Sequence, residues 1–174
     1  VGVPLRVESR GARRLVLAQA EPLMALAGIA ARKKDGQSVS GDAGTWFKSP
    51  NGDLYLVLCD GMGSGVAARQ ESALAVRLLE QFLQAGVAPE HALRTLNSAL
   101  ALREETEYAF TTIDLLRIDL FNGSGAVYKM GAAPTYIKKG GAVSRITGSA
   151  RPAGLSDSDT AAPDITPFHL DVGD

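Results

Sequence analysis

Cysteine and histidine are scarce in this chain of 174 residues, which holds one cysteine and two histidines. The single cysteine, Cys59, excludes a disulfide within the chain and a metal cluster built from several cysteines. The histidines, His91 and His169, are isolated, because neither has a partner at the spacing of a metal-binding motif. We therefore expect any metal site in this chain to use oxygen ligands.

An excess of charge is also missing, since 18 lysines and arginines face 19 aspartates and glutamates. The net charge of −1 gives no reason to expect nucleic acid or a membrane surface as a partner. Long apolar runs are missing too, because Gln19, Glu21 and Pro22 interrupt the stretch from Leu15 to Ala31. That stretch suits neither a membrane span nor a signal peptide. We expect a cytoplasmic setting, with any membrane anchor outside these residues.

The remaining composition is that of an ordinary globular protein, at 45% hydrophobic and 21% charged residues. The length suits one domain with its own core, and the sequence contains no internal repeat or low-complexity tract. We expect residues 1–174 to form a single domain, with residues 1–22 as an N-terminal lead-in.

Apolar periodicity and turn signals predict strands first, then two adjacent helices, then strands again. This order differs from the strand–helix alternation of a doubly wound parallel sheet, so it predicts an α+β protein with mostly antiparallel sheets. The predicted strands are Arg14–Ala20, Leu23–Arg32, Val39–Lys48, Leu54–Cys59, Ala109–Leu120, Ala126–Met130, Thr135–Lys138 and Val143–Thr147. The predicted helices are Val66–Gln84 and Ala88–Leu102, with a loop over Ser149–Pro167 and the approach to a further strand over Phe168–Asp174.

The most informative segment is an apolar strand that ends in an aspartate, Asp60, followed by glycines at Gly61, Gly63 and Gly65. A carboxylate at the end of a buried strand is costly unless a positive charge compensates it. Glycines allow another group to approach the backbone closely. Together these features indicate a binding site.

A hairpin turn at Asn51-Gly52 brings a second carboxylate to the same place. One register places Asp42 opposite Cys59, and a tighter turn places it opposite Gly61. Either register puts Asp42 beside Asp60, at a separation of about 5–8 Å. Two carboxylates at this range repel unless one is protonated or a cation lies between them. Oxygen ligands of this kind suit Mg²⁺ or Mn²⁺, and the Gly61 carbonyl is a further candidate ligand.

Two other interpretations of the same residues remain open. Asp42 and Asp60 also suit the simpler roles of capping a turn and a helix, which aspartates often fill. The run from Gly63 to Ala68 fits the G-x-G-x-x-A dinucleotide fingerprint, but that motif requires a strand after its helix, where a second helix is predicted here. The Gly-Lys-Ser/Thr signature of a mononucleotide loop is absent.

Several motifs in this order and spacing resemble the SpoIIE (sporulation stage II protein E) type of phosphatase domain. This is a bacterial branch of the PPM, or protein phosphatase 2C-like, metal-dependent serine/threonine phosphatases. The resemblance covers most of the chain from about Ala27 onward. The matching motifs are SGD at Ser40–Asp42, DGMGSG at Asp60–Gly65, LNSALALREETEYAFTTIDL at Leu96–Leu115, KMGAAPTYIKKGG at Lys129–Gly141 and RPAGL at Arg151–Leu155.

The resemblance implies an αββα sandwich of two mostly antiparallel sheets with flanking helices. It also implies a binuclear Mn²⁺ or Mg²⁺ centre, in which the carboxylate matching Asp60 bridges the metals and positions the attacking hydroxide. The carbonyl matching Gly61 and the carboxylate matching Asp42 would serve one of these metals, and Gly63 and Gly65 would form a hinge into the next helix.

The sequence departs from the family pattern in two ways. Many eukaryotic relatives have a histidine, a proposed general acid, where this chain has Met62. The sequence also stops at Asp174, before the C-terminal strands and helix that carry further metal-binding aspartates, so we expect a C-terminally truncated domain that is inactive in isolation. Cys59 lies in an apolar strand and is expected in the core.

The function implied is dephosphorylation of phosphoserine on an anti-anti-sigma factor, which activates a sporulation sigma factor. The chain is also a candidate homodimer, in which the helices over residues 66–102 couple partner contact to metal occupancy. The alternative is a regulatory module of the same fold that binds partners without catalysis. Thr111, Thr112 and Asp114 either line the cleft or form a polar strand face.

Overall fold

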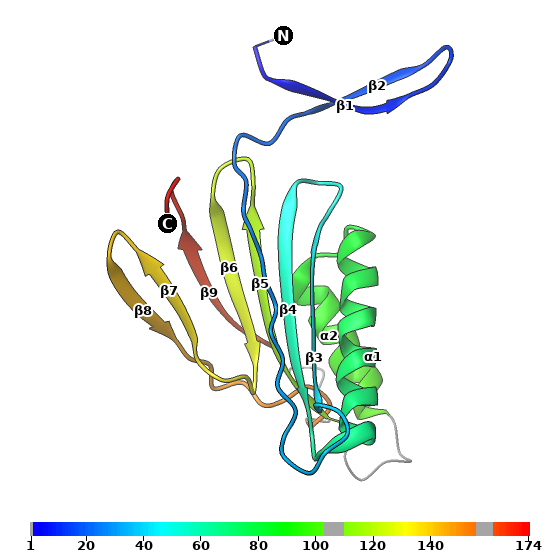
Figure 1. Cartoon of the computed structure of the whole chain (residues 1–174), viewed down its shortest axis with the longest axis vertical. Helices are drawn as coiled ribbons and strands as arrows, with labels where there is room; N and C mark the ends of the chain where they lie inside the picture. The colour runs from blue at the N-terminus through cyan, green and yellow to red at the C-terminus, as the bar shows by residue number, and fades with distance from the viewer. Residues whose placement is uncertain (1, 103–109, 156–161) are drawn as a thin grey trace.

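The computed structural model describes residues 2–102, 110–155 and 162–174. A five-stranded antiparallel sheet in the order β3-β4-β5-β6-β9 lies at its centre, and β1–β2 and β7–β8 form two separate hairpins (Figure 1). The strands are β1 (Leu5–Arg10), β2 (Leu15–Gln19), β3 (Asp42–Lys48), β4 (Asp53–Gly61), β5 (Thr111–Asp119), β6 (Ser124–Met130), β7 (Thr135–Lys139), β8 (Ala142–Ile146) and β9 (Asp164–His169).

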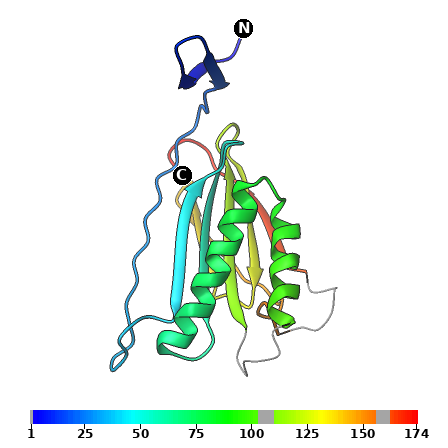
Figure 2. The ribbon, with the colours of Figure 1, turned by 90° about the vertical axis from the view of Figure 1, so that its right-hand side faces the viewer.

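Two helices, α1 (Gly65–Gln84) and α2 (Pro89–Ala101), cover one face of the central sheet (Figure 2). Gly86 ends α1 with a φ of 83°, in the left-handed region that favours glycine just past a helix end. Pro89 suits the first turn of α2, where a backbone N–H is not needed. The side chains between helices and sheet form the core, with fully buried members Val57, Leu79, Leu93, Leu96, Ile113 and Leu115. Among the described residues, no helix is both long and apolar enough to cross a membrane.

The predicted α+β class with antiparallel sheets is confirmed. The described residues contain one helical layer and one complete sheet of the expected αββα sandwich. Strands β7 and β8 and an extended segment, residues 22–33, lie on the side of the sheet away from the helices (Figure 2). The site described below lies where this extended segment and the helical layer both meet the end of the sheet.

The predicted strand over Leu23–Arg32 is wrong, because residues 22–33 form no strand ladder with any described residue. The segment does have the period-2 pattern of a strand, since alternate side chains are half-buried while Met24 and Leu26 are 84% and 89% exposed. A strand also needs a hydrogen-bonding partner. The pattern therefore identified an extended conformation but not a sheet.

Two strands were not predicted. β1 (Leu5–Arg10) pairs with β2, close to the predicted strand Arg14–Ala20. β9 (Asp164–His169) falls mainly in the stretch predicted as a loop, and it contains Pro167. Proline lacks the N–H needed in a central strand but is tolerated at a sheet edge, which is where β9 lies beside β6.

The other predicted elements are confirmed to within a few residues at their ends. One boundary cannot be compared, because Ala109, the predicted start of the strand that includes β5, lies outside the described residues.

Candidate metal centre

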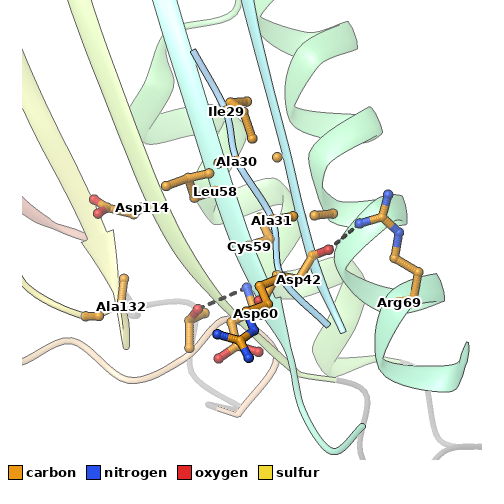
Figure 3. A pocket seen from close by; sticks show the side chains of 15 residues that line it. Ile29, Ala30, Ala31, Asp42, Leu58, Cys59, Asp60, Arg69, Asp114 and Ala132 are labelled. Atoms are coloured by element: carbon orange, nitrogen blue, oxygen red, sulfur yellow. Dashed lines mark hydrogen bonds between the residues drawn. The ribbon is translucent and has the colours of Figure 1, made fainter. Parts of the chain in front are cut away.

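The structure places Asp42 and Asp60 directly opposite each other, at the end of the β3–β4 hairpin (Figure 3). Both predicted registers were wrong by one residue, since Cys59 faces Ala43 and Lys48 faces Leu54. The two aspartates do lie side by side as predicted, but only the observed register puts both on one face of the sheet, since a shift of one residue moves a side chain to the other face.

The turn explains this register. Ser49 N donates a hydrogen bond to the Asp53 carbonyl at 2.8 Å, which leaves three residues, 50–52, in the loop. Gly52 has a φ of 86° and takes the left-handed position that commonly ends a three-residue hairpin loop. Pro50 fixes a negative φ, so it suits the first position of this loop. The predicted turn over Ser49–Gly52 is therefore correct, and its loop consists of residues 50–52.

Asp42 perturbs the carboxyl of Asp60. The pKa of Asp60 is raised, first by partial burial of its carboxyl, and then by a hydrogen bond and repulsion from Asp42. Without a cation, this pair keeps a proton more readily than an isolated aspartate does. A divalent cation would relieve the same repulsion.

Local hydrogen bonds orient Asp42. The Ser40 hydroxyl donates to Asp42 Oδ2 at 3.1 Å and accepts from Asp42 N at 3.3 Å. Helix α1 holds the same segment by its backbone, because Ser72 Oγ donates to the Gly41 carbonyl at 2.6 Å and Arg69 Nη1 donates to the Asp42 carbonyl. The strand end that carries Asp42 is therefore attached to the first half of α1.

Gly61 is the point at which α1 touches β4. A Cβ added at Gly61 would lie 2.0 Å from the Ala68 carbonyl oxygen and 2.8 Å from its carbonyl carbon, so only glycine fits. A Cβ added at Gly41 would lie 3.6 Å from the Gly61 carbonyl oxygen, which places that oxygen on the side of the Asp42 segment. The Gly61 carbonyl predicted as a ligand is thus near the carboxylate pair.

Two of the glycines that follow, Gly63 and Gly65, have φ values of 92° and 75°. Both lie in the left-handed region that other residues rarely adopt, so the connection from β4 to α1 depends on glycine. This geometry is compatible with the predicted hinge, and the movement of that hinge remains a prediction.

A pocket of about 430 Å³ opens beside the carboxylate pair. Asp42 and Asp60 lie close together in it, beside Ala31 of the extended segment (Figure 3). Thr112 and residues 29–32 also line the pocket. Asp114 lies farther along the same face, beyond Leu58 (Figure 3). Of the three residues left open by the sequence, Thr112 and Asp114 therefore line the pocket, whereas Thr111 is buried.

The donor atoms suit a hard divalent cation. Two carboxylates and a backbone carbonyl are oxygen ligands of the type that Mg²⁺ and Mn²⁺ prefer, and Mg²⁺ usually keeps several waters as well. Within residues 2–102, 110–155 and 162–174, no cluster of three or more His, Cys, Asp or Glu side chains could hold a metal. The described residues thus fit one side of a metal centre.

Sequence reasoning missed two residues that hold this corner, Arg69 and Ser72 of α1. It named Thr111 and Thr112 but not the contacts that their hydroxyls make with the backbone of Asp60. The spacing of Arg69 and Ser72 would have placed them on one helix face. Their backbone targets on β3, however, depend on tertiary contacts that no local pattern specifies.

A second cluster was also missed. Lys129 is 1% exposed, and its Nζ lies 2.9 Å from Asp114 Oδ2 and donates to Thr135 Oγ1 at 2.7 Å. The Thr135 hydroxyl donates to Asp114 Oδ2 at 2.5 Å. This ion pair ties β5, β6 and the start of β7 together.

Comparison of the sequence with known proteins identifies the family of this chain. A family model described as stage II sporulation protein E (SpoIIE) matches residues 50–174. The chain is 38% identical over 145 residues to stage II sporulation protein E of Priestia megaterium, an alignment covering 83% of this chain and 23% of that protein.

Comparison with solved structures leads to the same family and fold. A structure of the PP2C phosphatase domain and a fragment of the regulatory domain of SpoIIE from Bacillus subtilis has a TM-score of 0.81 and 28% identity, covering 97% of this chain and 51% of that chain. The crystal structure of RsbX in complex with magnesium shares the fold, with a TM-score of 0.64, 19% identity and coverage of 80% of this chain and 65% of that chain.

The chain thus spans less than a quarter of the length of the Priestia megaterium protein it matches. The family model covers well over half of the chain and includes Asp60 and the glycines after it. The chain therefore belongs to the stage II sporulation protein E family, and its sheet and helices form part of a PP2C-type phosphatase fold.

Proposed function

We propose that this chain is part of a metal-dependent protein serine phosphatase, and that Asp42, Asp60 and the Gly61 carbonyl provide one side of its metal centre. The observation that carries this proposal is the direct pairing of Asp42 with Asp60 at the end of the β3–β4 hairpin. Membership of the SpoIIE family supports the reaction class.

The proposed centre holds two Mn²⁺ or Mg²⁺ ions. When bound, such ions activate water for attack on phosphorus and neutralise charge on the phosphoryl oxygens. Asp60 would be shared between the ions, while Asp42 and the Gly61 carbonyl would serve one of them. Ser40 and Arg69 would keep the Asp42 segment in place through the hydrogen bonds described above.

The cysteine beside this corner is not suited to act as a covalent nucleophile. Cys59 is adjacent to Asp60 in sequence but is 2% exposed, and burial raises the pKa of its thiol, first through desolvation and then through the nearby Asp114 charge. A thiol that stays protonated is a poor nucleophile. The proposed reaction is therefore hydrolysis by activated water and not attack by this thiol.

The proposed substrate is a phosphoserine on an anti-anti-sigma factor, whose dephosphorylation activates a sporulation sigma factor in the cytoplasm. The relatives' names support a role in sporulation. We also propose that the protein acts as a homodimer, in which α1 and α2 couple partner contact to metal occupancy. The hydrogen bonds from Ser72 and Arg69 to the Asp42 segment provide a physical route for that coupling.

A second candidate function is a regulatory module of the same fold that binds partners without catalysis. It is favoured by the finding that the described residues bring only two acidic side chains together at the corner. Dinucleotide binding by Gly63–Ala68 is not supported, since α2 follows α1 directly and every pairing in the central sheet is antiparallel.

The test uses the full-length protein and a phosphoserine protein substrate, with and without Mn²⁺. We expect hydrolysis that depends on Mn²⁺ and is lost in Asp60→Ala. Asp171→Ala is the control, because that carboxylate is 68% exposed and is paired with Lys139. It lies outside the proposed metal corner, the name used below for Asp42, Asp60 and the Gly61 carbonyl. Hydrolysis without metal, or hydrolysis that survives Asp60→Ala, would overturn the proposal. Metal binding without any hydrolysis would favour the regulatory module.

A further inference from the structure

Two adjacent threonines at the start of β5 hold both backbone polar groups of Asp60. Thr111 Oγ1 donates a hydrogen bond to the Asp60 carbonyl at 2.8 Å, and Asp60 N donates one to Thr112 Oγ1 at 3.2 Å. Successive side chains of a strand point to opposite faces, so the two hydroxyls reach Asp60 from different sides of the sheet. This leaves the backbone of Asp60 with little freedom to rotate.

The contact made by Thr111 affects the positions of two proposed ligands, the Asp60 carboxylate and the Gly61 carbonyl. The Asp60 carbonyl belongs to the peptide unit that joins Asp60 to Gly61, and a peptide unit is a rigid plane. Fixing that plane fixes the Cα atoms of Asp60 and Gly61 at its two ends, from which the Asp60 side chain and the Gly61 carbonyl extend. Both of these groups are proposed metal ligands.

The position of this contact matters because it lies directly before the glycines that connect β4 to α1. Gly61 and Gly63 follow Asp60 within three residues, and glycine loses more conformational freedom on folding than any other residue. The backbone hydrogen bond from Met62 N to the Phe110 carbonyl is 3.3 Å long. The Thr111 hydroxyl therefore adds a restraint at the end of the strand.

Thr111 is itself firmly held. It is 1% exposed, its N–H donates to the Ala153 carbonyl at 3.0 Å, and its carbonyl accepts from Ala153 N at 2.9 Å. The next residue, Gly154, donates to Asn97 Oδ1 at 3.0 Å, and Asn97 is a 2% exposed residue of α2. A continuous series of buried hydrogen bonds thus runs from α2 through residues 153–154 to Thr111 and Asp60.

We propose that Thr111 is a positioning residue for the metal corner. Its hydroxyl, braced by residues 153–154 and Asn97, sets the peptide unit between Asp60 and Gly61 and so positions the two Cα atoms from which the Asp60 carboxylate and the Gly61 carbonyl extend. The inference rests on the proposed function, because it assigns a role within the same metal centre.

The experiment compares Thr111→Val, which keeps the shape but removes the hydroxyl, with Thr111→Ser, which keeps the hydroxyl. Both are made in the full-length protein, and Mn²⁺ binding is measured by titration calorimetry beside metal-free thermal unfolding. We expect Thr111→Val to weaken Mn²⁺ binding by about 10- to 100-fold, the range found when a partner of a metal ligand is removed. Thr111→Ser should bind within about fivefold of the original protein, the scale of one altered neutral hydrogen bond.

Thr45→Val is the matched control. Thr45 lies on β3 opposite Val57, three residue pairs away from the Asp42–Asp60 pair, so its Mn²⁺ affinity should not change. A purely structural Thr111 would lower the unfolding temperature of Thr111→Val and leave the Mn²⁺ affinity of the folded protein unchanged, and this result would overturn the inference.

A second variant covers the case in which Thr111→Val does not fold. Asn97→Ala removes the brace at Gly154 without altering β5, and we expect about fivefold weaker Mn²⁺ binding. Unchanged affinity in this variant would count against the inference. Hydrolysis is scored separately: a protein whose Mn²⁺ affinity depends on the Thr111 hydroxyl but which hydrolyses no phosphoprotein would refute the proposed function and leave the positioning role standing.

Discussion

Substituting Gly61 with alanine tests how closely α1 is coupled to the metal corner. The added Cβ would lie 2.0 Å from the Ala68 carbonyl oxygen, which belongs to the helix backbone and cannot rotate away. Since real Cβ atoms essentially never come closer than 3.0 Å to such an atom, the helix and strand must separate by about 1 Å. The substitution therefore displaces the first half of α1 relative to β4.

The expected cost has two parts. Forcing an extra carbon into a packed contact typically costs about 1–3 kcal/mol. The displacement also strains the hydrogen bonds from Ser72 to the Gly41 carbonyl and from Arg69 to the Asp42 carbonyl, each worth about 0.5–1.5 kcal/mol. We therefore expect Gly61→Ala to lower the free energy of unfolding by about 2–5 kcal/mol and to weaken Mn²⁺ binding.

Urea unfolding without metal measures the first effect, and titration calorimetry measures the second. Gly28→Ala is the control, because a Cβ at Gly28 meets no atom within 4 Å and its φ is not in the left-handed region. That substitution should change stability by less than about 0.5 kcal/mol. If Gly61→Ala were as mild as Gly28→Ala, or kept full Mn²⁺ affinity, the close contact between α1 and the ligand segment would be refuted.

Two further predictions concern charged groups. The raised pKa of Asp60 means that the folded state keeps a proton above the ordinary value of 3.8, so metal-free stability should fall as pH rises through the interval between 3.8 and the folded pKa. Asp60→Asn should remove this loss, making the chelator-treated variant more stable than the original protein at pH 7; equal stability by urea unfolding would contradict it. Asp114→Leu should destabilise the protein by about 3 kcal/mol, because it leaves the buried Lys129 ammonium without its carboxylate, and adding Lys129→Met should restore most of the loss. A double-mutant cycle measures this coupling, and a harmless Asp114→Leu would show that the ion pair does not matter to stability.

The helices were predictable because their signals are local. The apolar spacing in α1 and α2, the glycine after α1 and the proline at the start of α2 all act within one or two turns. The sheet was less predictable, because a strand pattern does not identify the neighbouring strand with which it pairs. Leu23–Arg32 has a strand pattern but forms no ladder with the described residues, whereas β9 contains a proline and still pairs with β6.

The same distinction between local and distant contacts applies to the candidate site. The Asp42–Asp60 pair was accessible from the sequence because both residues belong to one hairpin, and a hairpin constrains its own partners. The contacts of Thr111 and Ser72 were not accessible, because the residues they bind lie 51 and 31 positions away in the chain. Lys129 was missed for a similar reason, since a lysine is expected at the surface unless a buried partner is known.

The three-residue turn at Pro50–Gly52 has a consequence for how this hairpin tolerates insertions and deletions. The turn lies at one end of β3 and the carboxylate pair at the other, about 20 Å away along a seven-residue strand. Removing or adding one residue in the turn would shift the pairing by one and send one carboxylate to the opposite face of the sheet. We therefore expect a change in loop length to separate the two proposed ligands without altering either residue, whereas many substitutions in the same loop would be harmless. If the proposed metal centre is correct, the number of residues in this turn matters more to it than their identity.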